Sequence, residues 1–240
     1  MSITTGTATF NLDLSEIISE AFERIGKEER SGYDFKTARR SLNLLLAEWA
    51  NRGINLWTID SGTIPVYAGT ATYNLPVDTV DLLDHVVRTG SGTSQMDINI
   101  SRISESTYST IPNKNATGRP IQMWVNRLSG QTTPSGVQYP TVTIWPMPDQ
   151  GTVASPYYTI VYWRLRRIQD AGNAVNAQDI PFRFLNALIA GLAFYLSMKF
   201  PDVSGDRIQM LKAEYEQQLD MASSEAVSYT HLRAHETDSY

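Results

Sequence analysis

The chain has 240 residues, of which 42% are apolar, and this is enough to bury one large core or two modest ones. It contains no cysteine, which excludes disulfides, thiolate metal sites and thiol nucleophiles. The formal charge of −5 argues against a protein that grips nucleic acid, because phosphate contacts need clustered Lys and Arg, but it allows nucleic acid to pass alongside.

No segment predicts a membrane or secreted protein. The longest mostly apolar stretch, residues 184–198, is too short to cross a bilayer as a helix. The first residues have neither a basic start nor an apolar signal core. We therefore expect synthesis in the cytoplasm and no membrane partner.

The first part of the chain predicts two helices. Residues 13–25 carry an apolar stripe at helical spacing, and Asp13 and Glu16 are placed to form a capping box. From Phe35 to Trp49 apolar side chains recur three and four residues apart, with Gly53 as a C-cap.

The middle of the chain predicts a sheet or sandwich. Short runs rich in β-branched and aromatic residues are divided by Gly, Pro, Ser and Asn. Two of the runs flank an Ala68-Gly69 turn, which is the spacing of a hairpin. The predicted strands are residues 63–67, 71–75, 82–88, 121–126, 142–145 and 157–168.

Two further helices follow. Pro181 opens a helix that is apolar on nearly all sides, so it must be buried, and Pro201 ends it. A helix with one apolar face starts at Ser204. We predict an α+β fold whose terminal helices form a four-helix bundle with an inserted antiparallel β-rich domain. The expected domains are residues 1–57 plus 180–226 for the helices and 58–179 for the insert.

The end of the chain has an unusual sequence. Residues 227–237 read VSYTHLRAHET, which resembles one reading frame of an adaptor used in sequencing libraries. We therefore interpret residues 227–240 as a non-native tail.

Several segments carry a resemblance to a known family. The strongest is LNLLLAEWANRGINLW at residues 42–57. Further support comes from VYAGTATYNLP at residues 66–76, PNKNATGRP at 112–120, TIWPMPD at 143–149, YWRLRRIQDAG at 162–172 and DIPFRFLNALIAGLAFYLSMK at 179–199. Together they resemble the head-to-tail adaptors, or tail tubular proteins, that attach below the portal of podoviruses.

The resemblance implies a structural virion protein and no catalysis. It implies a homo-oligomeric ring of about twelve copies, closed by head-to-tail contacts. The ring would dock on the portal protein, extend the DNA channel and recruit the tail nozzle or tail tube protein. DNA would be passing cargo, the protein would be made in the host cytoplasm, and no cofactor or metal is implied.

Candidate interface residues follow from chemistry and spacing. Arg164 and Arg166 point to one face of a strand and Arg167 to the other. The simplest interpretation is a solvated edge strand, and the alternative is a set of interface anchors, because Arg is enriched at protein contacts. Nucleic-acid binding is a weaker third interpretation, since no wider basic surface accompanies the three arginines. Trp57 lies beyond the apolar stripe and is either core or contact, whereas Trp49 lies on the stripe and is predicted to be core.

A second candidate contact involves the first two helices. Arg39 and Arg40 lie on the polar face of the second helix, which usually means a solvated surface. In a ring they would meet the acidic side of the first helix of the next subunit, formed by Glu16, Glu20 and Glu23.

An enzymatic alternative remains open in the β-rich domain. Asp78, Asp81 and Asp84 contain the carboxylates that glycoside hydrolysis needs, although Asp is also common in turns. The whole chain has 10% aromatic residues, so side chains for stacking on sugars are available. The alternative function is a cell-wall-glycan hydrolase or carbohydrate-binding module. His85, which lacks a suitably held serine, is predicted to be a core or surface histidine.

Overall fold

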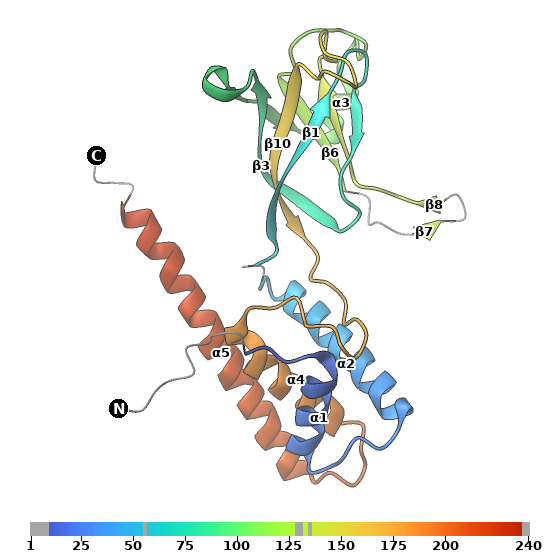
Figure 1. Cartoon of the computed structure of the whole chain (residues 1–240), viewed down its shortest axis with the longest axis vertical. Coiled ribbons are helices and arrows are strands. Elements are labelled where there is room, and N and C mark those ends of the chain that lie inside the picture. The colour runs from blue at the N-terminus through green and yellow to red at the C-terminus, as the bar shows by residue number, and fades with distance from the viewer. Residues whose placement is uncertain (1–9, 55–56, 128–131, 134–135, 237–240) are drawn as a thin grey trace. The chain divides into compact units, whose positions relative to one another are not determined.

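The computed structural model describes residues 10–54, 57–127, 132–133 and 136–236 (Figure 1). These residues contain five α-helices and two four-stranded sheets, which confirms the predicted mixed α+β class. The chain divides into two compact units, which are described separately. The helical unit is Met1–Trp57 with Ile168–Tyr240, and the β-rich unit is Thr58–Arg167.

The helical unit begins with α1 (Leu14–Ile25), and its predicted capping box is confirmed. The Asp13 side chain accepts a hydrogen bond from the backbone N–H of Glu16 at 2.9 Å, and Glu16 accepts one from the N–H of Asp13 at 3.0 Å. The helix ends at Gly26, whose φ of 79° lies in the left-handed region. Both ends of α1 are therefore defined by local sequence.

Helix α2 (Gly32–Asn51) starts at an N-cap, Ser31, and buries the predicted stripe that includes Leu42, Leu45 and Trp49. Its C-cap is Arg52 rather than the predicted Gly53. Gly53 lies one position further on, with φ of 77°, so the left-handed turn follows the cap as in many helix ends.

Helix α4 (Leu185–Ser197) lies at the centre of the helical unit. It packs against α1, α2 and α5 (Gly205–Glu236), and Figure 1 shows α2 and α5 on the two sides of it. Its residues are buried on nearly all sides, as the sequence predicted. The predicted start at Pro181 is early, because a 3₁₀ turn, η2 (Phe182–Phe184), precedes the helix. Residues from all four helices belong to one apolar core.

The connection that enters η2 also belongs to the helical unit. Residues 168–179 lack the apolar spacing of a helix, and in this respect their sequence is like that of the β-rich region. They are held to the helices by hydrogen bonds. The N–H of Leu14 donates to the carbonyl of Asn176 at 3.0 Å, and the N–H of Ala171 donates to the side chain of Asn43 at 2.8 Å.

The β-rich unit consists of two sheets that share a second apolar core. The first sheet has the order β1 (Ile59–Val66), β10 (Tyr158–Arg166), β3 (Thr79–Thr89), β4 (Met96–Asn99). The second has the order β2 (Thr72–Asn74), β9 (Thr141–Trp145), β6 (Gln122–Asn126), β5 (Ser101–Ile103). Apart from the parallel pair β5–β6, neighbouring strands of both sheets are antiparallel. The remaining short elements are η1 (Gly92–Ser94), α3 (Glu105–Ser109), β7 (Thr132–Thr133) and β8 (Gly136–Val137).

Two expectations about the strands are wrong. The runs around Ala68 and Gly69 do not form a hairpin, because β1 pairs with β10 while β2 pairs with β9 in the other sheet. The backbone N–H groups of this turn bond across to the carbonyls of Gly151 and Pro148 instead. Strand β10 is not an edge strand, since it lies between β1 and β3.

Candidate interface residues

The outer face of α2 is basic and carries two exposed apolar side chains. Lys36, Arg39 and Arg40 are exposed, which places the two predicted arginines on the surface. Tyr33 is 74% exposed and Leu44 is 56% exposed on the same helix. Tyr33 and Leu44 were not singled out from the sequence, although their positions outside the apolar stripe were a visible signal.

The exposed face of α1 is acidic. Glu16 and Glu23 are exposed, and the half-buried Glu20 accepts a hydrogen bond from Arg24 at 3.0 Å. Arg24 also pairs with Glu214 of α5 at 2.9 Å, so Glu20 is partly neutralised within the chain. The structure thus presents the acids and bases of the predicted contact on two different helices of one unit.

A groove of about 640 Å³ runs beside the acidic face of α1. Its walls come from the segment before α1, from α1 itself and from the start of α4. Phe10 and Phe182 are 66% and 67% exposed there, and their rings meet edge to face at 6.1 Å. These two residues were missed by the sequence analysis, because the groove depends on packing between distant segments.

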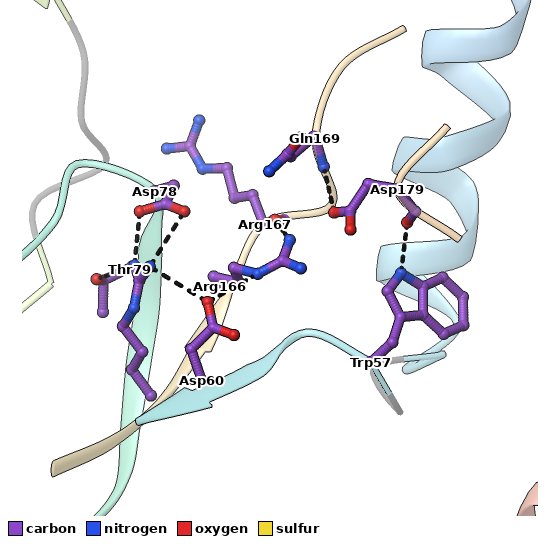
Figure 2. Close-up of polar contacts among 9 residues, drawn as sticks. Trp57, Asp60, Asp78, Thr79, Arg166, Arg167, Gln169 and Asp179 are labelled. Carbon is purple, nitrogen blue, oxygen red and sulfur yellow. Dashed lines mark hydrogen bonds and ion pairs between the residues drawn. The ribbon is translucent and has the colours of Figure 1, made fainter. Parts of the chain in front are cut away.

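Trp57 is held within the helical unit (Figure 2). Its indole N–H donates to the backbone carbonyl of Asp179 at 2.7 Å, and its ring lies 4.9 Å from that of Phe184. The side chain is partly buried against the helical core. Trp49 is fully buried, as predicted, and donates to the hydroxyl of Tyr215 at 3.0 Å.

Arg164 and Arg166 of β10 form an internal charge cluster in the β-rich unit. Figure 2 labels Arg166 with the partners Asp60 and Asp78 of this cluster. Both arginine side chains are 12% exposed. Arg164 pairs with Asp78 at 2.6 Å and with Asp60 at 3.4 Å, and Arg166 pairs with Asp60 at 2.9 Å. The two arginines share Asp60 and therefore lie on one face, as strand alternation predicted.

This cluster also fixes the protonation of Asp78. Burial alone would raise the pKa of this carboxyl, but the hydrogen bond and charge of Arg164 outweigh burial and hold the pKa below its usual value. Arg167, by contrast, has an exposed side chain, and its backbone N–H donates to the carbonyl of Asp78 at 2.8 Å. Arg164 and Arg166 thus serve internal packing in this chain, whereas Arg167 reaches the surface.

The aspartates considered for hydrolysis are engaged in other contacts. Asp78 pairs with Arg164, as described, and Asp81 pairs with Arg102 at 2.6 Å and with Arg127 at 3.4 Å. Asp84 accepts the backbone N–H of His85 at 2.7 Å. The low pKa of Asp78 does not suit a general acid, which must retain its proton near neutral pH. The geometry does not favour the hydrolase alternative.

His85 lies in the interior of the β-rich unit. It is 9% exposed, its Nε2 lies 3.1 Å from the carbonyl of Ile100, and its Nδ1 is buried with no hydrogen-bond partner among the described atoms. Burial lowers the pKa of the imidazole below its usual value, with Arg102 acting in the same direction. His85 is therefore a neutral core histidine at neutral pH.

Within the described ranges, no three His, Asp or Glu side chains gather in a way that would hold a metal ion. In the same part of the chain, no helix has the length and apolar character needed to cross a membrane.

Comparison with known proteins gives one clear match. The family of SU10 adaptor proteins matches residues 12–235, which includes the elements of both units. No curated protein matches the chain.

Proposed function

The chain belongs to the SU10 adaptor family and is thus a structural adaptor protein of a phage virion, and we propose that it forms a head-to-tail connector ring. The ring docks on the portal protein, extends the DNA channel and recruits the tail nozzle or tail tube protein. We propose about twelve copies per ring, closed by head-to-tail contacts as cyclic symmetry requires. The podovirus type of tail belongs to the same proposal.

The observation that carries this proposal is the family match over residues 12–235, because it spans both units rather than one. The charge of the chain is compatible with the role. A formal charge of −5 offers DNA few counter-charges, so the DNA slides past without being held.

We also propose that α1, α2, α4 and α5 act as one four-helix bundle that carries the β-rich unit as an insert. The sequence suggested limits of residues 1–57 plus 180–226 and residues 58–179, and we propose to move residues 168–179 from the insert to the helical domain, because they pack with the helices. The support is the single apolar core to which all four helices contribute, with α4 contacting the other three.

The origin of the C-terminal tail is a separate proposal. We propose that residues 227–240 are translated adaptor read-through, on the basis of VSYTHLRAHET alone. The family match extends into this segment as far as residue 235, and residues 237–240 lie outside the described residues. Sequencing the gene from viral DNA without library adaptors tests this directly, since a native codon series continuing through Val227–Tyr240 would disprove it.

The test of the connector function uses the portal protein of the same virus. Purified chain is mixed with assembled portal, and the complex is separated by size-exclusion chromatography with light scattering. We expect co-elution with a mass that corresponds to many adaptor copies per portal. A folded chain that elutes entirely apart from the portal, at every ratio and salt concentration tested, would disprove the proposal.

A further inference from the structure

The apolar groove beside α1 has the properties of a docking surface. Leu185 and Ile189 lie at its base with 6% and 4% exposure, and Phe10 and Phe182 remain mostly exposed at its side. Paired exposed aromatic rings of this kind are typical of protein contacts rather than of a free surface.

The rim of the groove is predominantly acidic. Glu16, Glu20 and Glu23 line it, spaced four and three residues apart on α1, with Arg183 as the one basic lining residue. A partner for this groove therefore needs an apolar ridge with basic side chains at helical spacing.

The outer face of α2 has this composition. Tyr33, Lys36, Arg40 and Leu44 recur three and four residues apart, so they form one stripe along the helix. All four are exposed, and Arg39 lies beside them. Among the described residues, no carboxylate forms an ion pair with Lys36, Arg39 or Arg40. We call this stripe the α2 ridge.

The spacings of the two surfaces match. Lys36 and Arg40 on the ridge are one helical turn apart, as are Glu16 and Glu20 on the rim. Each pair therefore spans about 6 Å along its helix axis, so two charge pairs are able to form at once. Along the ridge, Tyr33 precedes Lys36 and Leu44 follows Arg40. Both apolar side chains are therefore available to contact the apolar part of the groove.

We infer that the α1–α4 groove of one copy receives the α2 ridge of the next copy of this chain. Groove and ridge are different surfaces of the same unit, so the contact is heterologous and repeats around a ring. This inference rests on the proposed ring and names its helical contact. The nine residues before Phe10, MSITTGTAT, are the competing occupant, but they carry no basic side chain to meet the glutamates.

The test reverses the charge of the ridge and, separately, adds positive charge to the rim of the groove. The ridge variant is Lys36→Glu with Arg40→Glu. The groove variant is Ser19→Arg with Glu23→Arg, because both side chains are exposed on α1 and the change leaves the Asp13–Glu16 box and the Glu20–Arg24 pair intact. The control, Lys114→Glu with Arg127→Glu, makes the same change in net charge as the ridge variant, but on the β-rich unit.

Adaptor copies bound per portal are counted by light scattering at low salt. We expect each helical variant to need at least tenfold more protein than wild type to complete the ring, and the control to assemble as wild type. The chain carrying all four helical substitutions gives the acidic ridge basic partners at positions 19 and 23, which have the same spacing of four residues, and it is expected to assemble better than either variant alone. Circular dichroism melts of each unmixed variant establish that all of them are folded.

The outcomes separate the two proposals. If wild type never binds the portal, the connector function fails. If wild type assembles and the reversed variants assemble equally well, the groove-to-ridge contact is wrong while the connector stands. If deletion of residues 2–9 abolishes the ring while the charge reversals do not, the groove holds the chain's own N-terminal segment, and the inference is overturned.

A second measurement does not depend on charge. Because the chain has no cysteine, Ser19→Cys with Arg40→Cys introduces the only thiols. A bismaleimide cross-linker added to assembled rings is expected to give a ladder of covalent oligomers. Either substitution alone gives no ladder, and a double variant that also gives none in intact rings contradicts the contact.

Discussion

Arg164 shows how an arginine forms ion pairs in the interior of the β-rich unit. Arg164 is 12% exposed and holds two carboxylates, those of Asp78 and Asp60, which are 39% and 43% exposed. Removing this mostly buried arginine leaves both carboxylates without it as a partner, which destabilises the folded protein. Because the carboxylates are partly exposed to water, the loss of stability is smaller than for a fully buried pair.

The first prediction concerns this cluster. Arg164→Met is expected to lower the free energy of unfolding by about 1–2 kcal/mol. The matched control is Arg88→Met, whose pair with Asp97 is about one-third exposed on both sides, so its loss is expected to destabilise the protein less than Arg164→Met does. Urea unfolding measures both variants, and an equal loss in the two would show that burial of the cluster adds nothing.

The second prediction concerns His85 and pH. Its pKa is lowered in the folded protein, so between that value and about 6.5 the unfolded chain binds a proton that the folded protein does not. The free energy of unfolding therefore falls as the pH is lowered through this window, by at most about 1.4 kcal/mol per pH unit.

His85→Gln removes this contribution while keeping an amide donor for the carbonyl of Ile100. Urea unfolding of both proteins at pH 7.5, 6.5 and 5.5 is the measurement. We expect the advantage of His85 over glutamine in the free energy of unfolding to shrink as the pH is lowered. Parallel pH profiles would show that the buried imidazole takes up its proton as readily as in the unfolded chain.

A residue of the candidate site could be predicted from the sequence when its position depends only on nearby residues in the chain. Strand alternation was enough to place Arg164 and Arg166 on one face. Their shared partner Asp60 was out of reach, because it depends on β1 pairing with β10 about a hundred residues away. The same reason explains why an edge strand was expected where the structure has a central one.

Helix α4 is closely packed against its neighbours at Gly191. A Cβ atom added at Gly191 would lie 2.8 Å from Leu45 of α2 and 2.9 Å from the ring of Tyr215 of α5. Both neighbours are buried, and the hydroxyl of Tyr215 is held by Trp49, so neither is free to move away.

The third prediction follows from this close approach. Gly191→Val is expected to lower the free energy of unfolding by about 2–3 kcal/mol, because the overpacking outweighs any gain in helix propensity. The control is Gly205→Ala at the start of α5, where an added Cβ meets nothing within 4 Å and the effect stays within about 0.5 kcal/mol. Thermal or urea unfolding tests both, and a Gly191→Val protein as stable as the control variant would mean that the helices are packed more loosely than described.

The helices were predictable because their signals are local. The Asp13 capping box, the apolar stripe of α2 and the all-round apolar character of α4 each lie within a few turns of sequence. The strands around Gly69 were identified as strands but assigned the wrong partners. Pairing in a two-sheet fold is set by core packing between distant segments, which periodicity does not report.

For the molecule as a whole, the central claim is that many copies assemble into one layer on the portal. The fold supplies two separate units, and the helical one carries an acidic groove and a basic ridge on different helices. Two complementary surfaces on one unit permit closure into a ring without any other protein between the copies.

The most direct test is electron microscopy of portal particles with and without the added chain, followed by averaging of side and end views. We predict an additional ring layer on one end of the portal, coaxial with its channel, that appears only when the chain is present. Portal particles that look identical in both samples, while circular dichroism shows the chain to be folded, would contradict the connector function.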